Sequence, residues 1–420
     1  MDITLFFALL GGLLVLAFVA NRLVRFTRVP DVIILMATGV LIGPVLHWVN
    51  PDIFRGVTHG FGSLALILIL FEGGLELKLR EILRHFASGF FLSLFSYVLC
   101  VAAVAEVCRF ALHFSWIGAL LVGAVLGCIS SSIILPVLQQ LHLRRQVRVT
   151  LVVEASFGDA FAVLAVTTLL EIAAGGNAAP KAVAWALGSS LIVGVASGVL
   201  AGMLWSYLLP VLSEQRFWHV LTFAAVLLVY SGVHFLKGNE LVAVLVFGLT
   251  LSNIQAVRKR LHFDETAGSD WFSEMPIQDE KGHSPDHHGQ MLTFHGELAF
   301  LLRTFFFVLL GALVDYADLR NSIVLASLCF AAILGVRIIA VETGRLAWRG
   351  FSALERELMV WLVPRGLITA VLGIQVVQTR GSAFAFLPSL AFSVVLLSNL
   401  AVLVGAIRAR SLPAQSLEAT

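Results

Sequence analysis

The sequence predicts an all-α polytopic membrane protein with about 13 transmembrane helices. Of its 420 residues, 59% are hydrophobic and only 13% are charged, whereas soluble domains are roughly 45–50% apolar and about 25% charged. Apolar runs of about 20 residues, the length that crosses a bilayer, recur along the chain. These runs lack the two-residue alternation of a β-barrel, so helices must satisfy the backbone within lipid.

Charged or turn-rich breaks separate the apolar runs and give the order of the helices. We predict spans at residues 3–21, 31–47, 60–78, 87–110, 115–141, 148–173, 182–211, 217–236, 239–255, 296–316, 321–346, 356–378 and 384–407. Alternate breaks are rich in arginine and lysine, as at 22–28, 78–84 and 144–148. By the positive-inside rule these breaks are cytoplasmic, which predicts a multi-pass protein of the cell inner membrane with its N-terminus outside and its C-terminus cytoplasmic.

Six helices, a linker helix and six more would form two inverted repeats, because the eighth span enters from the opposite side to the first. The first repeat, the linker helix and the start of the second repeat then cover residues 1–254, and the remainder of the second repeat covers 296–410. The predicted cytoplasmic segments are a polar loop at 255–295 and a tail at 411–420.

The polar loop contains four histidines, His283, His287, His288 and His295. A solvated linker is the simplest interpretation of so polar a stretch. A pH sensor is the sharper alternative because histidine titrates near neutral pH. A metal site is less favoured, since the histidines match no known ligand spacing.

Two predicted spans are interrupted near their middle. The first is interrupted at 129–136, which contains the triplet Ser130, Ser131 and Ser132 and a proline, and the second at 362–367, which contains Pro-Arg-Gly. These spans take the fifth position in each half. Broken helices at matching positions are typical of inverted-repeat transporters whose binding site lies at the membrane midplane.

The sixth span carries two carboxylates, and ionisable groups at that depth cost several kcal/mol unless they are paired or hydrated. Glu154 and Asp159 are separated by roughly 140° around a helix, so they cannot share a face. Arg337 is the most deeply embedded cation, and we pair it with Glu154. Asp159 remains for cargo, because a carboxylate in a wetted cavity binds a proton or a small hard cation, but not both tightly. The alternative is that Asp159 binds no cargo and only forms a structural hydrogen bond with a neighbouring helix.

Two further charges lie within predicted spans. Glu72 is near the cytoplasmic end of the third span, where a carboxylate would line an entry funnel for cations. Arg303, in the tenth span, is long enough to snorkel to the cytoplasmic surface.

The sequence also argues against other functions. A net charge of +2 with dispersed basic residues does not favour nucleic acid as a partner. The serines and histidines show no arrangement of nucleophile and base, so we expect no enzymatic activity and no resident cofactor.

The residues resemble the cation:proton antiporter superfamily from the second predicted span to the last. The motifs that carry the resemblance are Phe-Glu-Gly-Gly-Leu at 71–75, the segment from Glu154 to Asp159, Arg-Thr-Phe-Phe-Phe at 303–307, Arg337 and Pro-Arg-Gly at 364–366. They look like the first branch, which holds the NhaP-type bacterial sodium/proton antiporters and the animal exchangers.

The resemblance implies an NhaA/NapA-like antiporter fold, a homodimer with a core and a dimerisation domain, and elevator-like alternating access. It implies that Asp159 carries the ion and the proton. It further implies that Glu154 and Arg337 form a structural charge pair, and that Arg365 lies near the helix crossing.

Several positions depart from the pattern of the first branch. Where this chain has Gly158, Ala155 and Ile129-Ser130-Ser131, that branch usually has Asn, Ser and Thr-Asp-Pro. The serine triplet at 130–132 looks more like the second branch, which includes potassium efflux systems. Ser156, or a hydroxyl or carbonyl from the triplet, would then complete the shell around a cation at Asp159.

The sequence therefore predicts an antiporter that exchanges Na⁺, with Li⁺ or K⁺ as alternatives, for H⁺. A single intramembrane aspartate favours one-for-one exchange. The expected partners are the cation, the proton, the lipid bilayer and a second copy of the chain. A potassium/proton antiporter, a cation-coupled symporter and a non-transporting membrane sensor are the alternatives.

Overall fold

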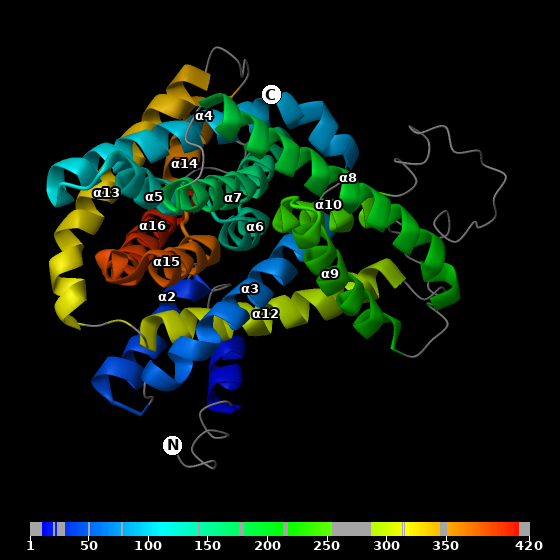
Figure 1. The fold of residues 1–420 in the computed structure, drawn as a ribbon, viewed down its shortest axis with the longest axis horizontal. Coiled ribbons are helices and arrows are strands. Elements are labelled where there is room, and N and C mark those ends of the chain that lie inside the picture. Colours follow the sequence, from blue (N-terminus) through cyan, green and yellow to red (C-terminus); the bar gives the residue numbers. More distant parts are fainter. Residues whose placement is uncertain are drawn as a thin grey trace. The chain divides into compact units, whose positions relative to one another are not determined.

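The structure, a computed structural model, describes residues 11–19, 22, 30–48, 51–76, 79–141, 143–175, 180–212, 217–253, 287–312, 314, 316–344 and 351–410. Every regular element within these ranges is helical (Figure 1). The elements are α2 (Asp31–Val40), η1 (Leu41–Val45), α3 (Pro51–Glu76), α4 (Leu79–Leu112), α5 (Trp116–Leu126), α6 (Ser131–Gln140), α7 (Arg145–Ala173), α8 (Pro180–Leu212), α9 (Trp218–Phe235), α10 (Glu240–Ser252), α12 (His287–Ala312), α13 (Tyr316–Thr343), α14 (Ala353–Trp361), α15 (Leu367–Arg380), η4 (Gly381–Phe384) and α16 (Leu387–Arg410).

The predicted all-α, multi-span fold class is confirmed. Within the described ranges, eight helical stretches are long and apolar enough to cross a membrane. Three shorter apolar helices, at Asp31–Val45, Gly62–Leu75 and Glu240–Ser252, add to them. Two of the predicted spans are each divided into two helices, α5 with α6 and α14 with α15.

The chain divides into two compact units. The first contains residues 1–64, 85–178 and 301–420. In this unit α7 packs on α5 and α6, α15 packs on α5, α7 and α16, and α13 packs on α14 and α16. The two broken helices therefore share neighbours, and their breaks lie in the interior of this unit.

The second unit contains residues 65–84 and 179–300. Its α10 packs against α8 and α9. A Cβ at Gly74 of α3 would lie 2.3 Å from the carbonyl oxygen of Leu245, so the glycine lets α3 approach the backbone of α10 closely.

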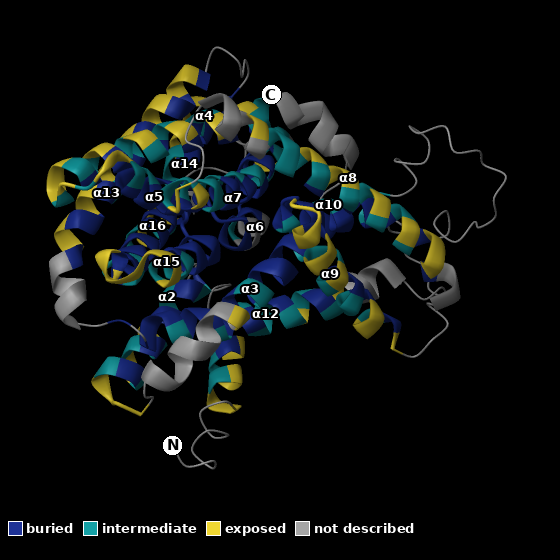
Figure 2. Cartoon of the chain, viewed as in Figure 1, coloured by how far each residue is buried: buried dark blue, intermediate teal, exposed yellow. Residues whose placement is uncertain are grey.

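Burial separates enclosed helices from open ones. Figure 2 shows mostly buried residues in α5 and α16 and many exposed residues along α8 and α13. The span at Trp116–Ile134 is 89% buried, whereas the span at Gly188–Leu209 is only 22% buried. Exposed residues of α8 include large apolar side chains such as Leu200 and Leu204. Such a surface is suited to contact with lipid.

The described helices differ from the predicted spans mainly at the polar loop. We expected this loop to reach His295, but α12 already begins at His287. The rings of Phe294 and His295 pack in the second unit, with His295 edge-on to Phe71 at 5.1 Å between ring centroids. These contacts support helix where the polar composition suggested a loop. His283 lies outside the described residues.

Candidate functional site

The breaks in the two interrupted helices cross in the first unit. Residues 127–130 separate α5 from α6, and residues 362–366 separate α14 from α15. The backbone N–H of Ser130 donates to the carbonyl of Pro364 at 2.9 Å. A Cβ at Gly366 would lie 2.3 Å from the Ser130 hydroxyl oxygen, so only glycine permits this approach.

Asp159 lies on α7 beside this crossing and is 1% exposed. Its Oδ2 accepts hydrogen bonds from the backbone N–H of Ser131 at 3.2 Å and from the Ser131 hydroxyl at 2.6 Å. Ser131 is the first residue of α6, where free amide groups and the helix dipole favour an anion. Among the described residues, Oδ1 of Asp159 is buried without a hydrogen-bond partner. That oxygen has lone pairs free for a proton or a cation.

The other serines predicted as ligands have different partners. Ser130 and Ser132 share a hydrogen bond of 3.0 Å between their hydroxyl groups. The hydroxyl of Ser156 donates to the carbonyl of Val152 in its own helix at 2.9 Å. Ser131 is therefore the predicted hydroxyl ligand whose hydrogen bond reaches Asp159.

Gly158 faces the break between α5 and α6. A Cβ added there would lie 3.6 Å from the Ser93 hydroxyl oxygen and 3.7 Å from the backbone nitrogen of Ile129, which is ordinary contact. The asparagine side chain usual at this position in the resembled branch would thus project toward that break. Glycine leaves the break without an amide group from α7.

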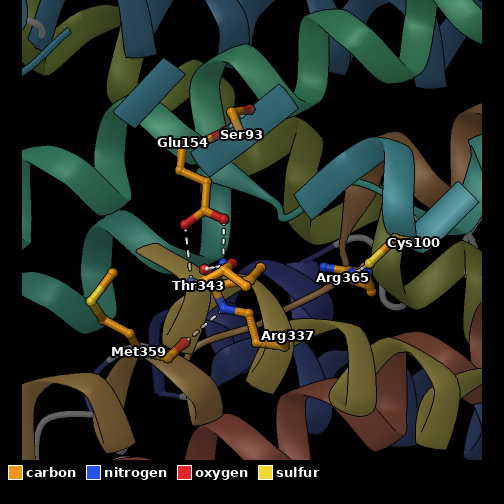
Figure 3. Close-up of polar contacts among 8 residues, drawn as sticks. Ser93, Cys100, Glu154, Arg337, Thr343, Met359 and Arg365 are labelled. Carbon is orange, nitrogen blue, oxygen red and sulfur yellow. Dashed lines mark hydrogen bonds and ion pairs between the residues drawn. The ribbon is translucent and has the colours of Figure 1, made fainter. Parts of the chain in front are cut away.

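Glu154 and Arg337 form a buried ion pair between α7 and α13 (Figure 3). The guanidinium is bidentate: Nη2 donates to Oε2 at 3.0 Å, and Nη1 donates to Oε1. Its Nε donates to the carbonyl of Met359 in α14 at 2.9 Å. Both carboxylate oxygens of Glu154 are thus engaged by a fixed cation, in contrast to those of Asp159. The pair joins α7, α13 and α14.

Arg365 is fully enclosed at the crossing. Its Nε donates to the carbonyl of Leu126 at 2.8 Å, at the C-terminal end of α5, where a cation complements the helix dipole. Its backbone N–H donates to the hydroxyl of Ser398 at 2.9 Å, and Asn399 donates to its carbonyl at 3.0 Å. In the described part of the chain its Nη1 has no hydrogen-bond partner.

Two sets of polar residues that support this region were not predicted from the sequence. One is Ser398 and Asn399 of α16, which hold the backbone of Arg365. The sequence feature that could have indicated Ser398 and Asn399 is a pair of adjacent polar residues inside an apolar run. The other is Asp31, which pairs with Arg303 at 3.0 Å. No local signal links these two residues, because they lie far apart in sequence.

Another ion pair in the first unit joins the segment before α7 to the start of α14. Arg144, the residue that precedes α7, donates through Nη2 to Glu355. Glu355 also accepts from the backbone N–H of Ser352 at 2.8 Å, completing a capping box. Burial raises the pKa of Glu355, but the hydrogen bonds from Arg144 and Ser352 outweigh burial, so its pKa lies below the ordinary value.

Glu72 lies in the second unit, on α3, and is partly buried. A Cβ at Gly296 of α12 would lie 3.0 Å from its Oε1, so the carboxylate packs against that helix. Its predicted place in a cation entry funnel stays a prediction.

The fold of this chain is similar to that of a membrane protein whose structure has been solved. The sodium proton antiporter MjNhaP1 from Methanocaldococcus jannaschii, in its structure at pH 8, matches with a TM-score of 0.75 at 18% identity. The match covers 98% of this chain and 100% of that chain. At this level of identity the likeness shows the fold.

Two relatives, both named as antiporters, align with most of this chain. The K(+)/H(+) antiporter NhaP2 of Shewanella sp. (strain MR-4) is 24% identical over 409 residues, which is 94% of this chain and 64% of that protein. The probable Na(+)/H(+) antiporter 2 of Methanocaldococcus jannaschii is 22% identical over 390 residues, which is 90% of this chain and 85% of that protein. The chain thus spans less than two thirds of the length of the Shewanella relative.

The family model for the transmembrane part of sodium/hydrogen exchangers matches residues 13–407. That range contains the helix crossing, Asp159 and the Glu154–Arg337 pair. The predicted resemblance to the cation:proton antiporter superfamily is confirmed, and the chain belongs to the transmembrane sodium/hydrogen exchanger family.

Proposed function

We propose that this protein is a secondary antiporter that exchanges a monovalent cation for a proton by alternating access, with both bound at Asp159. One observation carries the proposal. Asp159 is buried at the crossing of two broken helices, with one carboxylate oxygen bonded to Ser131 and the other without a partner among the described residues.

Exchange follows from competition at this carboxylate. A proton on Oδ1 neutralises the group, whereas a cation needs the charged form and oxygen ligands around it. Ser131 holds Oδ2 in either case, because its hydroxyl donates to the carboxyl oxygen. Ser130 and Ser156 remain candidates for the rest of the cation shell, and Glu72 remains a candidate for the cation entry funnel. One carboxylate of this kind supports one-for-one exchange.

The other buried charges support the site without binding cargo. Arg337 neutralises Glu154 through two hydrogen bonds, so that carboxylate is not available to a cation. Arg365 places a positive charge beside the crossing and satisfies the end of α5. Ser132 and Gly158 line the same region and influence the space available to the cation.

Na⁺ is the first candidate for the cargo, and Li⁺ and K⁺ are the alternatives. Relatives named for sodium and for potassium both match the chain. Gly158 supports potassium as an alternative, because a glycine leaves more room beside the break after α5 than the usual asparagine. The proposed setting is the cell inner membrane, with the N-terminus outside, the C-terminus cytoplasmic and two copies of the chain forming a homodimer.

The test is proton movement in everted vesicles that contain the wild type or Asp159→Asn, followed with a pH-sensitive dye. Sodium, lithium and potassium are added in turn at equal ionic strength. We expect the wild type to move protons in response to at least one cation and the variant to respond to none. Thr167→Ala is a matched control, because it removes a hydroxyl on the same helix that donates to the carbonyl of Val163 at 2.9 Å and has no proposed part in binding.

Other outcomes would point to other functions. Proton movement that requires an organic solute as well as a cation would indicate a symporter. A folded wild type that responds to no cation would leave a non-transporting sensor.

A further inference from the structure

One carbonyl in the first turn of α6 cannot make its helical hydrogen bond. In an α-helix the carbonyl of residue i accepts from the N–H of residue i+4. For Ser132 that residue is Pro136, which has no N–H. The turn that presents Ser131 to Asp159 therefore lacks one of the hydrogen bonds that would hold it.

Arg303 of α12 supplies the missing donor. Its Nη1 donates to the carbonyl of Ser132 at 2.8 Å. Its Nη2 donates to Oδ2 of Asp31 at 3.0 Å. The planar guanidinium reaches both acceptors at once, which a single ammonium group does less well. The side chain bridges α6 and α2 instead of extending to the surface.

Asp31 is itself fixed. Its Oδ1 accepts from the backbone N–H of Val32 at 3.0 Å, and it lies in the first turn of α2, where the helix dipole favours an anion. The side chains of Arg303 and Asp31 are only 14% and 15% exposed, so water competes weakly for their hydrogen bonds.

We propose that Arg303, oriented by Asp31, is a positioning residue for the cation and proton site. It replaces the hydrogen bond that Pro136 cannot make, and so keeps Ser131 directed at Asp159. This inference rests on the proposed exchange. Arg303 acts through the backbone of Ser132 and is not a ligand of the cargo.

The experiment measures cation-dependent proton movement in proteoliposomes for the wild type, Arg303→Gln and Arg303→Gln combined with Pro136→Ala. We expect Arg303→Gln to raise the cation concentration for half-maximal exchange about tenfold, the usual effect of losing a charged hydrogen bond. Alanine restores an N–H at position 136, so the combined variant should recover most of the affinity. Pro136→Ala alone should resemble the wild type.

The controls separate positioning from general stability. Arg380→Gln also removes an arginine that donates to a backbone carbonyl, that of Ala173 at 2.8 Å, and should leave the half-maximal concentration unchanged. Asp159→Asn should stay inactive with Pro136→Ala, because that substitution restores no carboxylate. If Arg303→Gln does not fold, Asp31→Asn should raise the half-maximal concentration in the same direction, by about threefold.

If the wild type exchanges cations normally, either of two results would overturn this inference and leave the proposed function intact. One is an unchanged half-maximal concentration in folded Arg303→Gln or in Asp31→Asn. The other is failure of Pro136→Ala to restore Arg303→Gln. A folded wild type that exchanges no cation would remove the proposed function and this inference together.

Discussion

Glu154 and Asp159 lie on the same helix, α7, yet their surroundings differ. Both oxygens of Glu154 accept hydrogen bonds from the guanidinium of Arg337. Neither oxygen therefore needs a mobile ion as its partner. One oxygen of Asp159 binds Ser131, and the other has no partner in the described ranges. A buried charge is tolerated when it is compensated, so the two residues are stable in different ways. Glu154 is compensated by Arg337, whereas in the proposed function Asp159 is compensated by its cargo.

Removing one member of the Glu154–Arg337 pair should destabilise the protein strongly. Glu154→Gln leaves the Arg337 charge buried without its counter-ion, and we expect a loss of about 3–5 kcal/mol in the free energy of unfolding. Thermal unfolding in detergent measures this loss. Ser93→Ala, which removes only the hydrogen bond to the Glu154 carbonyl, should cost about 1 kcal/mol.

A double variant tests the cause of that loss. Glu154→Gln combined with Arg337→Met removes both charges, so it should unfold at a higher temperature than Glu154→Gln alone. Equal stability of the wild type and Glu154→Gln would contradict the structural role of the pair.

Single residues were predictable from the sequence where few candidates competed. Arg337 was the most embedded cation and Glu154 a carboxylate on a different face from Asp159, so the pair that the structure contains could be inferred by elimination. The bond between Asp31 and Arg303 was not predictable, because the two residues are 272 positions apart and nothing in the sequence places α2 beside α12.

At the scale of elements, the crossing depends on close contact between two non-helical segments. Gly366→Ala would place a Cβ 2.3 Å from the hydroxyl oxygen of Ser130 and 2.7 Å from its Cβ. We expect a loss of about 1–3 kcal/mol in stability and reduced exchange, because the segments must separate.

Gly335→Ala in α13 is the control for that substitution, since nothing lies within 4 Å of the added Cβ. In this exposed helix position alanine should stabilise by up to about 1 kcal/mol. Thermal unfolding and the exchange assay measure both variants. If Gly366→Ala matched Gly335→Ala, close packing at the crossing would not be required.

The ion pair between Arg144 and Glu355 predicts a pH dependence. The pKa of Glu355 in the unfolded chain is about 4.3. In the folded protein its pKa lies below that value. The pair therefore contributes stability above about pH 4.3 and loses it as the pH falls through the folded pKa. At pH 7 the free energy of unfolding of Glu355→Gln should be about 1–3 kcal/mol lower than that of the wild type.

The difference in the free energy of unfolding between Glu355→Gln and the wild type should narrow as the pH falls from about 4.3 through the folded pKa of Glu355. A gap that stays constant over that range would show that the charge of Glu355 is not the source of the stability.

The elements themselves were largely predictable, because hydrophobic length and breaks are local properties of the chain. The serine triplet and Pro364 indicated both interruptions, which the structure places at 127–130 and 362–366. The start of α12 was not predictable. Its first turns are polar in sequence, and the ring contacts of Phe294 and His295 come from helices distant in the chain.

At the scale of the whole molecule, cargo binding should appear as stability. A ligand that binds only the folded protein, present at 100 times its dissociation constant, raises the free energy of unfolding by about 2.7 kcal/mol. We expect the transported cation to raise the unfolding temperature of the wild type but not of Asp159→Asn. Choline chloride at equal ionic strength is the control salt.

Acidification should weaken the stabilisation by the cation, since protons compete for the same carboxylate. Stabilisation of Asp159→Asn equal to that of the wild type would place the cation elsewhere.

Oδ1 of Asp159, which has no hydrogen-bond partner in the described part of the chain, also bears on energy conservation in the proposed cycle. An empty, ionised carboxylate is expensive to carry through a region of low dielectric. The site can therefore change sides at low cost only when a proton or a cation has neutralised it. A return trip without cargo is suppressed, so the gradients on the two sides do not dissipate through the protein. In the proposed cycle, the absence of a fixed counter-ion at Asp159 would thus couple the movement of the cation to that of the proton.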